Sequence, residues 1–309
     1  MPGTILVTGA SGLLGCNFVL TALRGNQKVI ALFHSYPLSF PGVRTIKIDL
    51  QDDTAVRELI MDIRPDWIVH CAALTQVDWC ETHRQETWKV NVDVPRHIAA
   101  TAREVGADLI YISSDSIFDG KTGCYGEESE PGPLNVYAES KLAGELAVLE
   151  ELDRSLVIRT NIYGWNVQEK MSLAEWMLHC LEAGQTLTGF YDIAFTPILV
   201  NDLSEIILDM MKLKLKGIFH VAGSQACSKF EFAMLLAGQF GLDRNRIQPF
   251  AAADSTELLA VRPKNTSLRT DKICTALGRL MPDINSGLKR FQEWRASGPL
   301  SQLRTKRGK

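Results

Sequence analysis

The sequence lacks several features that mark membrane, secreted and nucleic-acid-binding proteins. No apolar run reaches the roughly 20 residues that a membrane-spanning helix needs. The first residues show no basic segment followed by a long apolar stretch, so we expect no signal peptide. The formal net charge is only −3 and the pI about 6.1, which predicts no general affinity for nucleic acid or for an anionic membrane. We therefore expect a cytoplasmic protein.

Paired cysteines are also missing, because the seven cysteines are scattered along the chain and none forms a CxxC motif. Several of them lie inside apolar runs, which favours reduced thiols in a core over disulfides or a metal site. We therefore predict no metal site. The chain ends in a basic stretch, Arg304–Lys309, which we expect to be a solvated terminus rather than a binding site.

The first half of the chain shows β-rich runs that alternate with helical patterns. With 309 residues, 46% of them hydrophobic, the chain is long enough for a large core. The helical patterns lie near 12–23, 53–63, 85–104 and 135–151. The β-rich runs are Thr4–Gly9, Lys28–Phe33, Val43–Ile48, Asp66–Cys71, Asp108–Ser113 and Ser155–Thr160. This order predicts an α/β fold with a doubly wound (Rossmann) parallel sheet, covered by helices on both faces.

The alternation weakens beyond about residue 160, where the pattern becomes mainly helical. Helical patterns appear near 172–183, 202–212, 229–239 and 283–295, with short strands near 193–199 and 217–221. We predict a dinucleotide-binding domain over residues 1–160 and a smaller, mainly helical substrate lobe over 161–309. Segments around 190–215 are expected to rejoin the first domain.

A glycine-rich turn, VTGASGLLG, follows the first predicted strand and opens the first helix. Glycine allows a tight turn and a close approach to a pyrophosphate, and a helix N-terminus offers free N–H groups and a partial positive charge. In this strand–turn–helix setting the spacing predicts a dinucleotide site; a glycine turn without ligand is the alternative. The candidate cofactor-binding residues of the turn are Gly9, Ser11, Gly12, Leu13, Leu14 and Gly15.

The end of the second strand bears on which dinucleotide fits. An acidic residue there would bind the ribose 2′-hydroxyl and repel a 2′-phosphate, but the sequence reads FHSY. His34 and Ser35 can donate to a phosphate, so we expect NADP(H), with NAD(H) as the alternative. An ordinary surface histidine is an equally good explanation of His34. Asp49, followed by Leu50, is a candidate acceptor for the adenine amino group or else a turn or helix-capping residue.

The segment after the fourth strand, CAALTQVD, carries small residues where a cofactor would cross the sheet. Small side chains there can also serve tight packing alone. The candidate cofactor contacts in and beyond this segment are Cys71, Ala72, Ala73, Thr75 and Asn91.

The stretch NVYAESKLAGE places Tyr137 and Lys141 four residues apart on a predicted helix. Positions i and i+4 share one helix face, so the phenol and the ammonium can address one point in space. A chance pairing of two surface residues is the alternative interpretation.

Taken together, five blocks in order give the chain its family likeness: TGASGLLG, IVHCAALTQVDWCE, ISSDSIFDG, YAESKLAGE and RPKNTSL. With these blocks it resembles the extended short-chain dehydrogenase/reductases, and in particular the dTDP-4-dehydrorhamnose reductase family. The resemblance implies a hydride-transfer site with Ser114, Tyr137 and Lys141 as catalytic residues. Tyr137 would donate a proton to the substrate carbonyl, Ser114 would hydrogen-bond both, and Lys141 would lower the pKa of the phenol and hold the nicotinamide ribose. Asn91 matches the asparagine that pins the catalytic helix, against the alternative of an asparagine with only local bonds.

The resemblance also implies a nucleotide-sugar substrate, although two positions depart from the family. Ser116 stands where the family commonly has tyrosine, and Ile162 stands where it often has tryptophan. Pocket-lining differences decide which sugar is accepted rather than whether hydride moves. Arg262 suits a substrate diphosphate, or else it forms an internal ion pair. The candidate substrate-binding residues are Thr75, Val77, Ser114, Ser116, Tyr137 and Arg262.

The expected activity is therefore NAD(P)H-dependent reduction of the 4-keto group of a nucleotide-activated deoxysugar. The family analogy also suggests a homodimer. Two alternatives stay open. One is an NADP-binding regulatory protein that resembles the β subunit of methionine adenosyltransferase, and the other is a nucleotide-sugar epimerase or dehydratase. Asp115 in SSDSIF has no glutamate beside it, which argues against dehydration.

Overall fold

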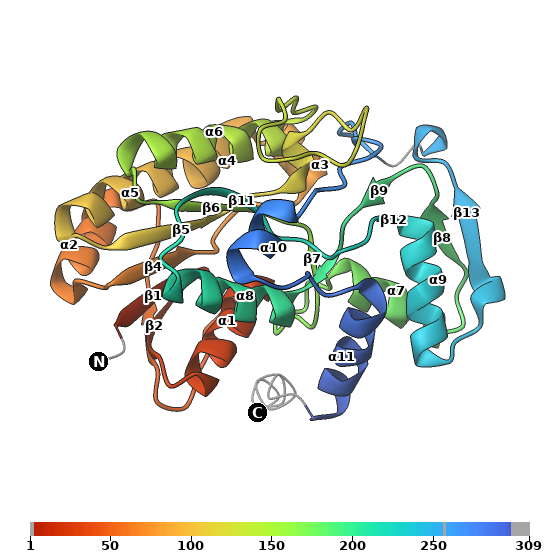
Figure 1. Ribbon diagram of the computed structural model, residues 1–309, viewed down its shortest axis with the longest axis horizontal. Helices are drawn as coiled ribbons and strands as arrows, with labels where there is room; N and C mark the ends of the chain where they lie inside the picture. The colour runs from red at the N-terminus through yellow and green to blue at the C-terminus, as the bar shows by residue number, and fades with distance from the viewer. Residues whose placement is uncertain (1–2, 256–257, 298–309) are drawn as a thin grey trace.

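A seven-stranded, all-parallel sheet forms the centre of the computed structural model, which describes residues 3–255 and 258–297 (Figure 1). The expected basic terminus Arg304–Lys309 lies outside the described residues. The strand order is β3-β2-β1-β4-β5-β6-β11. The strands are β1 (Thr4–Thr8), β2 (Lys28–Phe33), β3 (Arg44–Lys47), β4 (Trp67–His70), β5 (Asp108–Ile112), β6 (Leu156–Arg159) and β11 (Gly217–His220). The order reverses between β1 and β4, so ligands are expected at the carboxyl ends of these strands.

Helices cover both faces of this sheet, and each face has its own apolar core. One core contains residues of α1 (Leu13–Arg24) and α8 (Val200–Lys212). The other contains residues of α2 (Asp53–Ile63), α5 (Val94–Val105) and α6 (Val136–Glu151). Local signals set the ends of these helices: Asp52 caps α2, Asn135 caps α6, and Gly106 ends α5 in the left-handed conformation. The predicted α/β fold class is thus confirmed.

A smaller lobe, drawn on the right of Figure 1, contains most of the chain after residue 160. Its helices include α7 (Leu173–Glu182), α9 (Lys229–Phe240) and α11 (Ile284–Ser297). Ser172 and Ser228 start α7 and α9 with capping boxes, each paired with a glutamate three residues on. The lobe's short strands pair two by two: β7 (Ile162–Tyr163) with β10 (Ile198–Leu199), β8 (Leu187–Phe190) with β13 (Ile247–Phe250), and β9 (Ala194–Phe195) with β12 (Cys227–Ser228). The short helix α10 (Asp271–Leu277) follows them.

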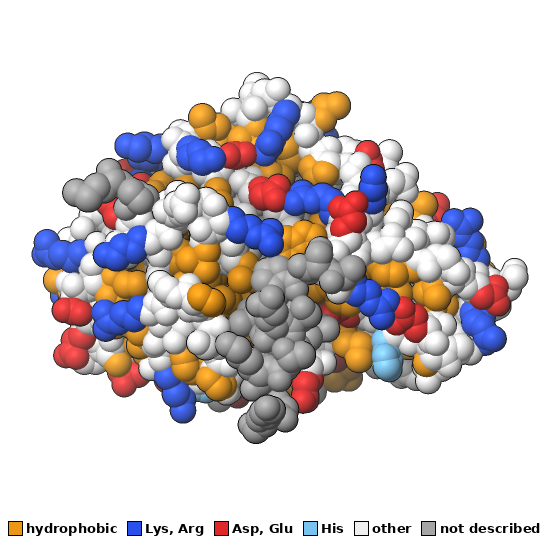
Figure 2. All heavy atoms as spheres, turned by 90° about the horizontal axis from the view of Figure 1, so that it is seen from below, with side chains coloured by type: hydrophobic (Ala, Val, Ile, Leu, Met, Phe, Trp, Pro, Cys, Tyr) orange, Lys and Arg blue, Asp and Glu red, His pale blue; other side chains and the backbone are white. Residues whose placement is uncertain are grey.

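The later segments return to the sheet, since α8 packs on α1 and β11 pairs with β6. The division of the chain into two domains stays a prediction. Across the described ranges, no helix is both long and apolar enough to cross a membrane. The face shown in Figure 2 carries interspersed blue and red side chains rather than a field of one sign.

One predicted helix differs from the structure in a way that matters for the site. The expected continuous helix 85–104 is divided into α4 (Arg84–Trp88), a π-helical turn η1 (Lys89–Asp93) and α5. Just before it, the short helix α3 (Val77–Thr82) follows the loop after β4. A π turn inserts an extra residue, and such turns often occur at functional sites. Here the π turn contains Asn91, whose side chain is buried.

Gly144 lets α6 approach η1 and β5 closely. A Cβ atom at this position would lie 2.3 Å from the Asn91 carbonyl oxygen and 2.3 Å from the Tyr111 phenol oxygen. Replacing glycine by alanine inside a helix usually stabilises by up to about 1 kcal/mol. For Gly144→Ala we expect the opposite sign, a loss of about 1–3 kcal/mol in the free energy of unfolding, because the added methyl has no space. Urea denaturation measures this change.

Gly126→Ala is the matched control, because nothing lies within 4 Å of the Cβ position there. The control is expected to change stability by less than about 0.5 kcal/mol. A stabilised Gly144→Ala protein would contradict the close approach of α6.

Candidate active site

The glycine turn between β1 and α1 is tightly packed, and it leaves the N-terminus of α1 without a side-chain cap. Gly9 has φ +61°, and a Cβ there would lie 2.7 Å from the Ala72 nitrogen. A Cβ on Gly15 would lie 2.3 Å from the Gly9 carbonyl oxygen, so this residue permits the packing of helix on turn. Gly12 is the N-cap of α1, and no side chain caps it. The first N–H groups of α1 are therefore available to an anion.

Two cavities meet in front of this turn. The first, of about 490 Å³, extends from Gly9 and Gly12 to the ends of β2 and β3. The second, of about 500 Å³, extends from Gly12 to the ends of β5 and β6. Their linings share Gly12, Cys71, Ala73, Thr75, Gln168 and Lys170. The cavities thus form one continuous cleft along the carboxyl edge of the sheet, where doubly wound folds bind ligands.

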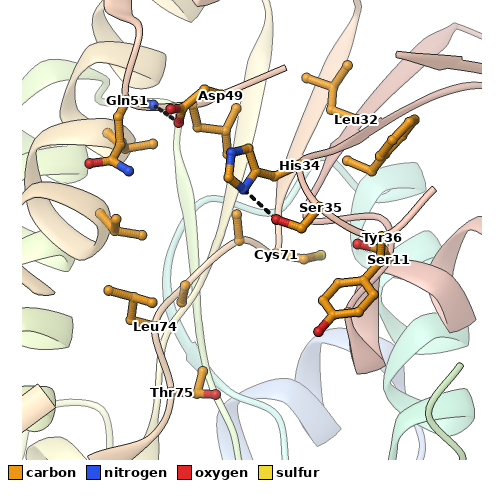
Figure 3. A pocket seen from close by; sticks show the side chains of 18 of the residues that line it. Ser11, Leu32, His34, Ser35, Tyr36, Asp49, Gln51, Cys71, Leu74 and Thr75 are labelled. Atoms are coloured by element: carbon orange, nitrogen blue, oxygen red, sulfur yellow. Dashed lines mark hydrogen bonds between the residues drawn. The ribbon is translucent and has the colours of Figure 1, made fainter. Parts of the chain in front are cut away.

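The first cavity brings together the residues that the sequence proposed for the adenosine end of a dinucleotide. Figure 3 shows His34 and Ser35 on its rim, between Asp49 on one side and Ser11 on the other. The side chains of His34, Ser35 and Asp49 are all exposed. The Ser35 hydroxyl and His34 Nδ1 are 2.9 Å apart, and Asp49 Oδ1 accepts from the Gln51 backbone N–H at 3.0 Å. Asp49 therefore makes a turn as well as lining the cavity, whereas the cap of α2 is Asp52.

The second cavity contains the proposed catalytic set. Ser114, Tyr137 and Lys141 all line it, together with Ser116 and with Leu13 and Leu14 of α1. The Ser114 hydroxyl and the Tyr137 phenol share a hydrogen bond. Ser114 Oγ also donates to Asp115 Oδ1 at 3.2 Å. The tyrosine and the lysine that stand four residues apart in the sequence do face one cavity.

Lys141 is almost completely buried, with 2% of its surface exposed. Its ammonium donates to the Ile112 carbonyl oxygen at 2.8 Å and lies 4.1 Å from the centre of the Tyr111 ring. Burial lowers the pKa of Lys141 to about 7, against the attraction of Glu145. Glu145 is itself buried and paired with Arg159 of β6 at 2.8 Å.

The pKa of Tyr137 moves opposite to the expectation that Lys141 lowers it. Burial raises the pKa of the phenol to about 12, although the hydrogen bond with Ser114 opposes the rise. The nearby carboxyl group of Asp115 adds to it. Lys141 is not among the groups that shift the pKa of this phenol, and its ammonium donates instead to the Ile112 carbonyl. At neutral pH the phenol therefore keeps its proton.

Asn91 connects the loop after β4 to the catalytic helix. Its Oδ1 accepts from the Leu74 N–H at 2.9 Å, and its Nδ2 donates to the Leu74 carbonyl and to Ser140 Oγ, both at 3.0 Å. The alternative of an asparagine with only local bonds is wrong, since the partners lie 17 and 49 residues away. In this structure the connection to α6 is direct, through Ser140.

The proposed substrate residues divide into two groups. Thr75 and Ser116 line the second cavity, whereas Val77, the first residue of α3, lines neither cavity of the cleft. Arg262 pairs with Asp78 at 2.6 Å and donates to the Ala260 carbonyl at 2.9 Å. It lines a separate groove of about 640 Å³ with Lys121 and Tyr191. The structure therefore has the internal ion pair that was the alternative for Arg262.

The cleft residues that were missed from the sequence include Asn161, Gln168 and Lys170. All three line the second cavity, and Asn161 donates to Asp115 Oδ2 at 2.8 Å. They lie outside regular elements in the segment between β6 and α7, where the sequence has no periodicity that predicts which side chains face the cleft. The position of Asn161 directly after a predicted strand was the one available indication.

A parallel doubly wound sheet, an open glycine turn and a Ser–Tyr–Lys set in one cleft define an extended short-chain dehydrogenase/reductase. Within that class, the chain belongs to the family described as the RmlD substrate binding domain, whose model matches residues 3–295. In the described part of the chain, no group of three or more His, Cys, Asp or Glu side chains is arranged to hold a metal ion.

Known proteins similar to this chain include reductases and a subunit of methionine adenosyltransferase. A probable low-salt glycan biosynthesis reductase of Haloferax volcanii is 31% identical over 91% of this chain and 95% of its own. The methionine adenosyltransferase 2 subunit beta of Bos taurus is 33% identical over 90% and 84%. The structure of a dTDP-4-dehydrorhamnose reductase from Bacillus anthracis in complex with NADP has a TM-score of 0.84 and 28% identity, with 95% of this chain and 99% of that chain covered.

The lowered pKa of Lys141 gives a stability prediction. The unfolded chain holds the lysine proton up to about pH 10.4, whereas the folded chain releases it near pH 7. Between these values the unfolded state binds more protons, so stability contributed by this group rises with pH. We expect the difference in free energy of unfolding, native minus Lys141→Met, to increase by about 1–2 kcal/mol from pH 7 to pH 9. Urea denaturation of both proteins at pH 7 and pH 9 measures this difference. An equal difference at the two pH values would contradict the burial of an ammonium that releases its proton near pH 7.

Proposed function

We propose that this protein is an NADP(H)-dependent reductase that converts the 4-keto group of a nucleotide-activated deoxysugar to an alcohol. The observation that carries the proposal is the single cleft that joins the open N-terminus of α1 to Ser114, Tyr137 and Lys141. A nicotinamide dinucleotide fits this cleft because small residues, Ala72 and Ala73, line its floor and Gly12 leaves the helix dipole accessible. The dTDP-4-dehydrorhamnose reductases and the glycan biosynthesis reductase among the similar proteins support the same reaction class.

Each of the three residues then has a distinct role. The reduced nicotinamide, when bound, supplies the hydride. Tyr137 donates its phenolic proton to the carbonyl oxygen, and its raised pKa of about 12 keeps that proton in place at neutral pH. Ser114 positions the phenol through the hydrogen bond that it shares with Tyr137. Lys141 lines the same cavity, and its pKa of about 7 lets it supply a proton near neutrality when the phenol is restored.

The neighbourhood of Asp115 favours reduction over dehydration. Its Oδ2 accepts hydrogen bonds from Thr266 at 2.6 Å and from Asn161 at 2.8 Å. Burial raises the pKa of Asp115, and these two hydrogen bonds oppose the rise. The carboxyl group is thus engaged in joining the segment after β5 to Asn161 and Thr266, and the next side chain is Ser116 rather than an acid. A dehydratase needs an acid that is free to act on the sugar.

A second candidate is a regulatory subunit that binds NADP without turning it over. The observation in its favour is the 33% identity to the methionine adenosyltransferase 2 subunit beta of Bos taurus. A complete Ser114–Tyr137–Lys141 set is the feature that a purely regulatory protein would not need.

The first prediction of the proposal concerns Tyr137→Phe. We expect kcat/KM for NADPH oxidation with a 4-keto nucleotide sugar to fall at least about 100-fold, because the proton donor is lost. The dissociation constant for NADPH should stay within about threefold, since the phenyl ring remains. Tyr191→Phe is the control, because Tyr191 is exposed and lines neither cavity of the cleft.

Unchanged turnover of Tyr137→Phe would contradict the proposed chemistry. If the unaltered protein binds NADPH tightly but reduces none of a panel of dTDP-, GDP- and UDP-linked 4-keto sugars, the regulatory function is favoured instead.

The second prediction concerns the choice of dinucleotide. His34 and Ser35 lie exposed on the rim of the first cavity, with no acid at the end of β2. We expect Ser35→Asp to weaken NADPH binding at least about tenfold and to leave NADH binding unchanged or stronger, because a carboxylate repels the 2′-phosphate. Ser39→Asp adds the same charge at an exposed position outside the cavity and serves as control. Equal losses for both dinucleotides would contradict the NADP(H) assignment.

A further inference from the structure

The segment 167–172, here called the strap, leads from the smaller lobe toward the glycine turn. Two side chains attach it to the dinucleotide-binding half of the cleft. Gln168 Nε2 donates to the Ser11 carbonyl oxygen at 2.8 Å, and Lys170 Nζ donates to Thr75 Oγ1 at 3.1 Å. Asn166 shapes the base of the strap, because its side chain bonds both the Lys170 carbonyl at 2.8 Å and the Gln168 N–H at 3.1 Å. The two side chains are therefore placed by defined contacts.

The strap lies where the two cavities of the cleft meet. Of the six residues that line both cavities, Gln168 and Lys170 come from the strap, and the other four come from the glycine turn and the loop after β4. A dinucleotide that places its adenosine in the first cavity and its nicotinamide in the second must pass its diphosphate through this junction. There the diphosphate has the N-terminus of α1 on one side and the strap on the other.

The charges at the junction are complementary to a diphosphate. Lys170 is the sole lysine or arginine among the described residues that line the first cavity. In the second cavity the other cation is Lys141, whose ammonium is directed to the Ile112 carbonyl. Lys170 has a neutral hydroxyl as its partner and takes part in none of the ion pairs found in the described ranges. The side chain of Lys170 is exposed to the cleft, and partial burial lowers its pKa.

We propose that the strap clamps the diphosphate of the bound dinucleotide, with Lys170 as the cationic contact and Gln168 as the attachment to the glycine turn. The proposal rests on the proposed function, since it requires a dinucleotide in the cleft. An ammonium acts on phosphate oxygens as a compact point charge, and the bond to Thr75 holds it at the junction beforehand. The helix dipole, worth roughly half a charge, leaves most of the diphosphate charge for Lys170 to balance.

The test compares the dissociation constants of Lys170→Met, Lys170→Arg and the unaltered protein for three probes. Binding of NADPH is followed by its fluorescence, and binding of adenosine 2′-monophosphate and of dTDP is followed by calorimetry. We expect Lys170→Met to bind NADPH at least about tenfold more weakly, the loss of a charge-assisted contact. Affinity for adenosine 2′-monophosphate, which has no diphosphate, should change by less than about twofold. Lys170→Arg should keep most of the NADPH affinity, because its charge remains.

Lys28→Met is the matched control, since it removes the same charge from an exposed position at the opposite end of β2. It should bind NADPH as the unaltered protein does. An unchanged NADPH affinity of Lys170→Met would overturn the clamp while leaving the proposed function intact. A loss confined to dTDP would assign Lys170 to the substrate's diphosphate and overturn the dinucleotide assignment. If the unaltered protein fails to bind NADPH, both the clamp and the proposed function are contradicted.

Discussion

The buried ammonium of Lys141 constrains the whole cleft. A desolvated ammonium must keep a hydrogen bond, and here the acceptor is the carbonyl oxygen of Ile112, the last residue of β5. This bond holds α6 against the carboxyl end of the sheet, and Gly144 provides the space for that approach. One turn earlier Tyr137 reaches Ser114, and one turn later Glu145 binds Arg159 of β6. Three successive turns of α6 therefore connect the proposed catalytic residues to the sheet.

Burial sets the protonation of the proposed catalytic pair in a direction that suits reduction. A phenol with a raised pKa arrives at the carbonyl with its proton, and an amine with a pKa near 7 exchanges protons with its surroundings. The sequence suggested a different route, in which the lysine charge lowers the pKa of the tyrosine. That route fails because burial of the phenol raises its pKa, and the spacing of two residues along one helix does not reveal burial. The contacts of the Lys141 ammonium with Ile112 and Tyr111 likewise join segments about 30 residues apart in sequence.

The features that the sequence predicted well are local or periodic. The alternation of strands and helices predicted the fold class, and the glycine spacing predicted the uncapped N-terminus of α1. The YxxxK spacing gave two side chains in one cavity. The unpredicted features depend on contacts between distant segments. The π turn contains Asn91, whose side chain donates a hydrogen bond to Ser140. Arg262 pairs with Asp78, which lies 184 residues away in the sequence. The strap has no periodicity, so its two lining residues became visible only in the folded chain.

The central claim is that hydride passes from a dinucleotide in this cleft to a keto carbon of a nucleotide sugar. The most direct measurement uses NADPH that carries deuterium at the transferable position of the nicotinamide, with dTDP-4-keto-6-deoxyglucose-type sugars as substrates. The account predicts that NMR of the product shows deuterium on the former carbonyl carbon, in proportion to the NADPH consumed. Product without deuterium at that carbon, or no product while NADPH remains bound, would contradict it.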